Sequence, residues 1–246
     1  MKNSKKQKNN FFLSLIPAKN NSVGLFKKNF LKLNNISLYK LTLLASLNSN
    51  YIYSTFISSD SKKILKDSEK LGAISIKRPK KLCLKNTLAK DVVYHFINYV
   101  KNKYNFDNFK NFNIIYLQPT SPFRSHLHIN KAIKFFLKNG STPVISVVDS
   151  KKPIEKSLKI INRRVFPLSS YKKVTFNRQT LEKTFFPNGA IYIFKINDFL
   201  KQKDIPIKKA FGFEMDQVSS IDIDDFFDYQ VASFFSKKLI KFRQKL

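Results

Sequence analysis

The sequence has a single cysteine, Cys83, which excludes an internal disulfide and a metal site built from cysteine thiolates. It also lacks any apolar stretch close to the roughly 20 residues of a membrane-spanning helix. A short apolar run, residues 11–16, follows a basic segment as in a signal peptide, but Pro17 ends it without a small-residue cleavage site. We therefore expect a cytoplasmic protein without a membrane partner, a disordered basic tail at residues 1–10, and Cys83 in the core.

Acidic residues are scarce, because 16 Asp and Glu stand against 46 Lys and Arg, for a formal net charge of +30. A strong positive field attracts polyanions. The lysines, however, are scattered over nearly every segment, and no recognisable DNA- or RNA-binding motif accompanies them. We interpret the charge as compositional bias and predict no specific nucleic-acid partner. A protein that binds polyanions through its net charge is the alternative.

Short apolar segments alternate with amphipathic ones, the pattern of strands followed by helices. Expected strands are Phe11–Ile16, Tyr51–Ser58, Ile74–Lys77, Asn113–Leu117, Pro143–Val148, Leu158–Ile161, Gly189–Phe194, Gly212–Met215 and Ser220–Ile223. Expected helices are Leu38–Leu47, Lys62–Leu71, Leu88–Tyr104, His126–Leu137 and a last one from Asp225 to about Phe242. The alternation predicts an α/β fold with a mostly parallel sheet, whose ligands bind beyond the carboxyl ends of the strands.

Two polar loops follow predicted strands. Loop 17–29 has a glycine, hydroxyls and lysines that suit a polyphosphate, but it lacks the Gly-Lys-Ser/Thr ending of a P-loop. Loop 117–124, Leu-Gln-Pro-Thr-Ser-Pro-Phe-Arg, is stiffened by two prolines and is expected to display an amide, two hydroxyls and a guanidinium. Such mixed donors suit an anionic, polyhydroxylated ligand, and an ordinary proline-rich turn with Ser125 as a helix cap is the alternative.

Two carboxylates lie two residues apart in the predicted strand Ser220–Ile223 and just after it. Residues at this spacing share a face of a strand, so Asp222 and Asp224 would point the same way and bind Mg²⁺ beside a triphosphate. A charged strand end is the alternative. Upstream, Asn188-Gly189 predicts a turn that opens a strand, and Arg178 is suited to binding a carboxylate through two hydrogen bonds.

Taken together and in this order, these motifs resemble those of the N-acylneuraminate cytidylyltransferases over roughly residues 11–235. The most specific segments are 117–124, 178–179, 188–193 and 220–224, with support from 28–29, 58–60 and 78–79. The resemblance implies a nucleotide-diphosphosugar-transferase-like α/β fold in one domain, residues 11–246, and a homodimer. Residues 151–187, where the strand–helix alternation stops, are then the excursion that makes the dimer contact and reaches toward the partner's sugar site.

The resemblance also implies the reaction: a nine-carbon 2-keto-3-deoxy sugar acid attacks the α-phosphate of CTP, with Mg²⁺, and pyrophosphate is released. The residues it assigns to the nucleotide are Ala18, Lys19, Ser22, Lys28, Asn29, Arg78 and Thr87. Those it assigns to the sugar acid are Gln118, Thr120, Arg178, Gln179, Asn188 and Tyr192. Lys28, Asp222 and Asp224 are the expected catalytic residues, the two carboxylates as metal ligands.

The chain departs from the family's pattern at several positions. Lys19 stands where the family usually has Arg, Val23 where a basic residue is frequent, and Phe26 where Pro is usual. Lys85 replaces a frequent acidic residue, and Phe186 a frequent Arg. Because the metal pair and the sugar-site motifs are intact, we interpret these changes as drift. The alternatives are an enzyme for legionaminic or pseudaminic acid, and a catalytically degenerate homologue that binds nucleotide sugars.

Overall fold

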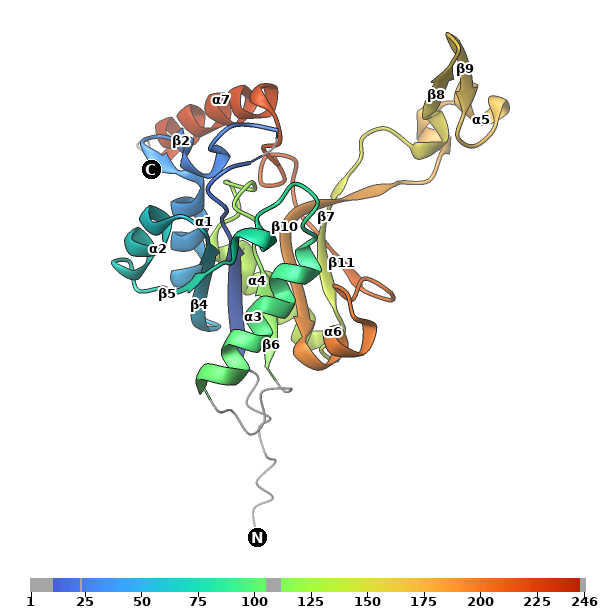
Figure 1. The fold of residues 1–246 in the computed structure, drawn as a ribbon. Helices are drawn as coiled ribbons and strands as arrows, with labels where there is room; N and C mark the ends of the chain where they lie inside the picture. The colour runs from blue at the N-terminus through green and yellow to red at the C-terminus, as the bar shows by residue number, and fades with distance from the viewer. Residues whose placement is uncertain (1–10, 23, 105–111, 244–246) are drawn as a thin grey trace.

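A twisted, mostly parallel sheet of seven strands forms the centre of the computed structural model, which describes residues 11–22, 24–104 and 112–243 (Figure 1). The predicted basic tail and Val23 lie outside the described residues. The strand order is β11-β7-β10-β6-β1-β4-β5. Their bounds are β1 Phe12–Pro17, β4 Ile52–Ser59, β5 Ile74–Lys77, β6 Asn113–Tyr116, β7 Val144–Asp149, β10 Phe185–Lys195 and β11 Phe211–Glu214. Only β10 runs antiparallel to its neighbours, so the predicted fold class is confirmed.

Helices cover both faces of this sheet. Their bounds are α1 Leu38–Leu47, α2 Lys62–Glu69, α3 Ala89–Tyr104, α4 His126–Lys138, α6 Ile196–Gln202 and α7 Phe226–Arg243. Buried side chains of α1, α2 and α4 pack on one face, whereas α3 and α6 pack on the other through Phe96 and Phe199. Helix α7 lies against the short hairpin of β2 (Lys32–Leu33) and β3 (Ile36–Ser37), with Leu33 and Ala232 in one cluster. Among the described residues, no helix is long and apolar enough to cross a membrane.

Local capping explains where several helices begin. The Ser125 hydroxyl accepts a hydrogen bond from the His128 backbone N–H, and the His128 ring accepts one from the Ser125 N–H, which completes a capping box for α4. At α2, the Ser61 hydroxyl accepts a hydrogen bond from the N–H of Ile64. The predicted cap Ser37 precedes α1 but its side chain makes no capping bond.

One predicted strand is wrong. Residues 217–224 form a turn and an irregular segment instead of the strand Ser220–Ile223. The backbone N–H of Ile223 donates to the carbonyl of Thr120, at 2.9 Å, and the Ile223 side chain is fully buried beside Leu33 and Leu38. Backbone and side-chain hydrogen bonds and the burial of Ile223 therefore fix this segment, and it forms no strand ladder.

Residues 150–184, here called the arm, leave the sheet between β7 and β10 and project from the body (Figure 1). The arm holds η4 (Ile154–Lys156), the hairpin of β8 (Leu158–Ile161) and β9 (Arg164–Pro167), α5 (Tyr171–Thr175) and η5 (Arg178–Thr180). Its base is closed by a bond from the Ser150 N–H to the Thr184 carbonyl, at 2.9 Å. Pro153 is the only buried residue of the arm, so the arm has no core of its own.

Candidate functional site

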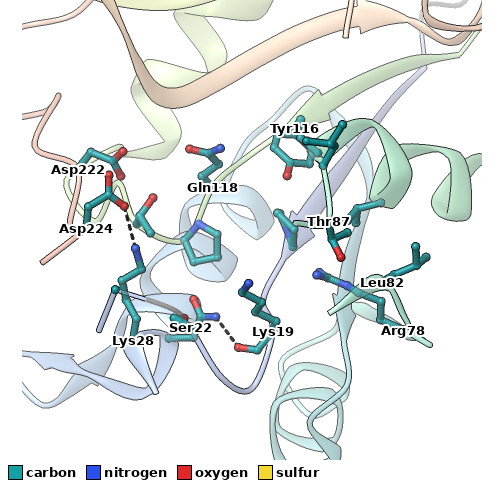
Figure 2. Close-up of a pocket in the computed structure, with 18 residues that line it drawn as sticks. Lys19, Ser22, Lys28, Arg78, Leu82, Thr87, Tyr116, Gln118, Asp222 and Asp224 are labelled. Atoms are coloured by element: carbon teal, nitrogen blue, oxygen red, sulfur yellow. Dashed lines mark hydrogen bonds and ion pairs between the residues drawn. The ribbon is translucent and has the colours of Figure 1, made fainter. Parts of the chain in front are cut away.

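A cavity of about 640 Å³ lies at the edge of the sheet where the parallel strands β1, β5 and β6 end (Figure 2). Its walls come from the loop after β1, the residue after β5, the start of α3, the loop after β6 and the segment before α7. The predicted site residues that line it are Lys19, Ser22, Lys28, Asn29, Arg78, Thr87, Gln118, Thr120, Asp222 and Asp224. Segments up to about two hundred residues apart in sequence thus meet because parallel strands present their carboxyl ends at one edge.

The loop after β1 folds onto the acidic segment. Lys28 Nζ donates to Asp224 Oδ1 at 2.9 Å, and the lysine side chain is only 12% exposed (Figure 2). A Cβ on Gly24 would lie 2.8 Å from the backbone oxygen of Asp224, so this approach requires glycine. Within the loop, the buried Asn29 donates from Nδ2 to the carbonyl of Lys19 at 2.7 Å. The loop therefore brings the Lys28 ammonium against the Asp224 carboxylate at one end of the cavity, and Lys19 lines the cavity as well (Figure 2).

Arg78 occupies the other end, beside Thr87 (Figure 2). Its Nε donates to the Ser58 hydroxyl at 3.0 Å and its Nη2 to the Ser58 carbonyl at 2.6 Å. Burial lowers the pKa of this guanidinium. The side chain is thus held rigidly against the end of β4.

The two acidic residues have different environments. Asp224 is 77% exposed, whereas Asp222 is largely buried, and this burial raises the pKa of Asp222 while the Thr120 hydroxyl lowers it. Oδ1 of Asp222 is buried and has no hydrogen-bond partner among the described residues. No cluster of three or more metal-ligating His, Cys, Asp or Glu is present in the described part of the chain. An unpartnered buried oxygen beside a second carboxylate fits Mg²⁺, which keeps water and phosphate oxygens as its other ligands.

The turn before the central part of β10 approaches this acidic residue. Gly189 has φ +71°, and a Cβ there would clash with Gln118 Oε1 and lie 3.3 Å from Asp222 Oδ2. Asn188 itself lies outside the cavity. Its amide accepts from Ser146 Oγ and donates to Ser220 Oγ at 2.8 Å, so its side chain shapes the turn.

A second cavity of about 310 Å³ adjoins the first, because Ala89, Tyr116 and Gln118 line both. Tyr192, predicted at the sugar site, lines only the second one, where its ring packs edge-on against Tyr116 at 6.1 Å between centroids. Burial raises the pKa of the Tyr192 hydroxyl. The remaining wall is the end of α6 and the segment after it, with Gln202, Asp204, Ile205, Ile207 and Lys208. Gln118 is thus part of the wall of both cavities.

Besides Asn188, three more predicted site residues, Ala18, Arg178 and Gln179, line neither of these cavities. Ala18 is fully buried under the loop after β1, with its N–H bonded to the Ser58 carbonyl at 2.9 Å. Arg178 and Gln179 lie on the arm and line a separate cavity of about 360 Å³ at its base. Within one chain, therefore, Arg178 does not meet Gln118.

The expected display of the whole loop 117–124 is wrong in part. Gln118 and Thr120 line the cavity, but Ser121 is fully buried and Arg124 is only 2% exposed. Arg124 Nη1 instead donates to the carbonyls of Gln118, at 3.0 Å, and Ala190, at 2.9 Å. Arg124 therefore connects two backbone segments and is not available to a ligand, which the polar composition of the loop did not indicate.

Sequence reasoning also missed the apolar wall. Leu88, Ala89 and Val92 line the main cavity from the first turn of α3 and the residue before it, together with Leu82 and Tyr116. The spacing of Leu88 and Val92 is the signal that was available, since residues four apart lie on one face of a helix. Nothing in the sequence alone indicated that this face borders a cavity.

Comparison with known proteins identifies the family. The family model for cytidylyltransferases matches residues 13–240. The chain is 30% identical to N-acylneuraminate cytidylyltransferase of Escherichia coli O18:K1:H7 over 95% of its own length, but it spans only 54% of that relative. It is 29% identical to CMP-N,N'-diacetyllegionaminic acid synthase of Campylobacter jejuni, over 90% of this chain and 93% of that one.

Among solved structures, the chain resembles CMP:2-keto-3-deoxy-manno-octonic acid synthetase complexed with CTP. The TM-score is 0.65 with 12% identity, over 93% of this chain and 99% of that one, so this likeness concerns the fold. The family match covers nearly the whole sheet and every segment that lines the main cavity. The chain therefore belongs to the cytidylyltransferase family.

Proposed function

We propose that this protein activates a nonulosonic, sialic-type acid: CTP and N-acylneuraminate give CMP-N-acylneuraminate and pyrophosphate. The observation that carries the proposal is the main cavity, which combines Lys19, Lys28 and Arg78 with the acidic pair Asp222 and Asp224. The two relatives named above act, by their names, on N-acylneuraminate and on a legionaminic acid. Because CTP is a cytoplasmic metabolite, the proposal includes a cytoplasmic location.

Charge neutralisation and alignment account for most of the work in phosphoryl-type transfer. Lys28 and Lys19 neutralise the triphosphate, while Arg78, Asn29 and Thr87 bind the cytidine end of the cavity. Gln118, Thr120 and Tyr192 hold the sugar acid across the two adjoining cavities. The anomeric hydroxyl oxygen bonds to the α-phosphorus as the bond from that phosphorus to the β-phosphate oxygen breaks. Pyrophosphate leaves, and the hydroxyl proton passes to solvent.

Asp222 and Asp224 are the residues proposed to hold Mg²⁺. The ion, when bound, neutralises charge on the phosphate oxygens. Asp222 Oδ1 has no other partner among the described residues, which supports this role, whereas Asp224 is paired with Lys28. Lys28 must therefore exchange the carboxylate for phosphate oxygens when CTP and the ion bind.

A homodimer is part of the proposal, with the arm as its contact. The arm exposes large apolar side chains without a core to bury them, among them Ile160 at 73% and Leu168 at 60%. A second copy of the chain would cover them and bring Arg178 to the partner's sugar site. Light scattering checks this: the wild type is expected at twice the chain mass, and Ile160→Glu at the chain mass. A wild-type monomer would remove the dimer from the proposal.

The direct test mixes the protein with Mg²⁺, CTP and one sugar acid at a time, and measures pyrophosphate release. We expect pyrophosphate release when N-acetylneuraminic acid is combined with CTP. We expect none when ATP, GTP or UTP replaces CTP. Asp222→Asn provides the inactive control for contaminating pyrophosphatase or transferase. Absence of release with every nonulosonic acid would overturn the proposal.

The second candidate is the same reaction on legionaminic or pseudaminic acid. It is favoured by the C. jejuni relative, which the chain matches over 93% of that protein's length. The panel of sugar acids separates the two candidates, since the preferred substrate is the one with the larger kcat/KM. A catalytically degenerate homologue would bind CTP, by calorimetry, without pyrophosphate release.

A further inference from the structure

Arg124 is the most unusual charged residue near the site, because its side chain is almost completely buried at 2% exposure. Its Nη1 bridges two carbonyl oxygens, that of Gln118 after β6 and that of Ala190 in β10. Nε and Nη2 have no hydrogen-bond partner among the described residues. A buried cation with unused donors is costly and is kept only where other groups stabilise its charge.

The nearby negative charge is Asp222. Burial lowers the pKa of the Arg124 guanidinium to about 9, and Asp222 acts in the opposite direction. Asp222 in turn has a buried oxygen without a partner among the described residues. Asp222 is thus the acidic residue that acts on the Arg124 charge, whereas Lys28 and Asp224 act on Asp222 itself, and no direct hydrogen bond joins Arg124 to Asp222.

The carbonyls that Arg124 bridges belong to residues that shape both cavities. Gln118 lines both cavities, and Ala190 follows Gly189, where an added Cβ would clash with Gln118 Oε1 and lie 3.3 Å from Asp222 Oδ2. β6 and β10 are antiparallel neighbours paired through Tyr116 and Tyr192. Beyond this pair the backbone ladder ends, and the Arg124 side chain joins the two chain segments through the carbonyls of Gln118 and Ala190.

We propose that Arg124 is a positioning residue for the transfer reaction: its guanidinium fixes the backbone at Gln118 and Ala190, and its buried charge stabilises the Asp222 carboxylate at the cavity edge. The positioning role rests on the proposed function, whereas the charge pairing concerns the protein without substrate. Arg124 lines neither cavity, so it acts on the sugar side through Gln118 and leaves the cytidine end, around Arg78, unchanged.

A stability cycle tests the charge pair without any substrate. Thermal unfolding is measured for Arg124→Met, Asp222→Asn and the double variant. Each single change removes one member of the proposed charge pair, so the double variant is expected to lose clearly less in Tm than the sum of the two single losses. Additive losses would overturn the charge pairing. The control cycle, Arg78→Met with Asp222→Asn, is expected to be additive, because Arg78 is bound to Ser58.

Kinetics of Arg124→Lys test the positioning. Lysine keeps the charge but not the planar fork that reaches two carbonyls. We expect the KM for the sugar acid to rise about tenfold or more and kcat to fall, because small displacements at a reacting centre have large effects. The Kd for CTP, from calorimetry, is expected within about twofold of wild type.

A purely structural role would give a different pattern. Unchanged KM values with a lower kcat, or parallel losses of CTP and sugar binding, would overturn the positioning role. If the wild type binds CTP but transfers it to no sugar acid, the proposed function fails while the stability cycle still decides the charge pairing.

Discussion

The site cavity and the arm are built in opposite ways. In the body, ten predicted site residues from distant segments meet in one cavity, and some of the charged ones are held by specific partners, such as Arg78 by Ser58. In the arm, residues 150–184 bury only Pro153 and expose most of their apolar side chains. The body is a complete structure in one chain, whereas the arm has surfaces that a single chain leaves uncovered.

The difference between body and arm bears on the role of Arg178. The residue has the chemistry that a sugar carboxylate needs, yet it lies on the arm, apart from Gln118. Because the arm has no core of its own, the position of Arg178 is best explained if a second chain packs against the arm and completes the site. Changes in the body should therefore act on one chain's nucleotide chemistry, and changes in the arm on assembly and sugar binding.

The largest effect is expected from the acidic pair in the body. Asp222→Asn should reduce kcat by about two orders of magnitude or more, the scale seen when developing charge loses an electrostatic partner. Pyrophosphate release under saturating substrates measures it. Asp198→Asn, on the first turn of α6 and away from both cavities, is the matched control and should keep wild-type turnover. Near-normal turnover in both Asp222→Asn and Asp224→Asn would show that the metal is held elsewhere.

Lys28 should give the next largest effect. Lys28→Met removes a charge-assisted contact with the triphosphate, so the Kd for CTP should rise about 10- to 100-fold. It also frees Asp224, so Mn²⁺ should bind the nucleotide-free protein more tightly than wild type. Calorimetry and electron paramagnetic resonance measure the two changes.

The neighbouring Lys27→Met is the control for Lys28. Lys27 Nζ lies 5.3 Å from the ring centroid of Phe26, and Lys27 does not line the main cavity. It should change neither CTP affinity nor metal affinity. Weaker Mn²⁺ binding in Lys28→Met would show that the Lys28–Asp224 pair does not compete with the metal.

The fold was predictable because apolar periodicity is a local signal. Helix Leu38–Leu47 and strand Ile74–Lys77 have the predicted bounds. The failures depend on tertiary contacts. Ser220–Ile223 alternates as a strand does, but the burial of Ile223 and its bond to Thr120 fix the segment without a neighbouring strand.

The site was predictable where the family resemblance assigned residues that line the main cavity, as at Lys28 and Asp222. It was not predictable where burial decides the role. Asn188 and Arg124 carry donors that suit a ligand, but both are buried and bound to backbone or hydroxyl groups. A sequence states which donors a loop has, whereas only the packed structure states which of them face the cavity.

In the arm, Arg178→Lys should raise the KM for the sugar acid about tenfold and leave the KM for CTP unchanged. A lysine cannot form the paired bonds of a planar guanidinium with a carboxylate. Steady-state kinetics with each substrate varied in turn measure the two constants. Arg163→Lys, on the turn of the arm hairpin, is the control and should change neither. A larger effect on CTP than on the sugar acid would assign Arg178 to the nucleotide.

The smallest effect concerns the phosphate loop, where the chain departs from its family. Lys19→Arg restores a planar guanidinium at a residue that lines the cavity, and it should strengthen CTP binding by about 1 kcal/mol, or roughly fivefold, the scale of one charge-assisted hydrogen bond at a partly wet site. Lys32→Arg, on the exposed edge of β2, is the control and should leave the Kd unchanged. If the chain is a working enzyme that has drifted, the change acts through CTP affinity and the KM for the sugar acid stays constant. If it is degenerate, calorimetry detects no CTP binding before or after the change, because an added donor cannot restore a site that no longer binds the triphosphate. That outcome would keep the family assignment of the body and remove the catalytic proposal, and the arm would then be the only part with a predicted role.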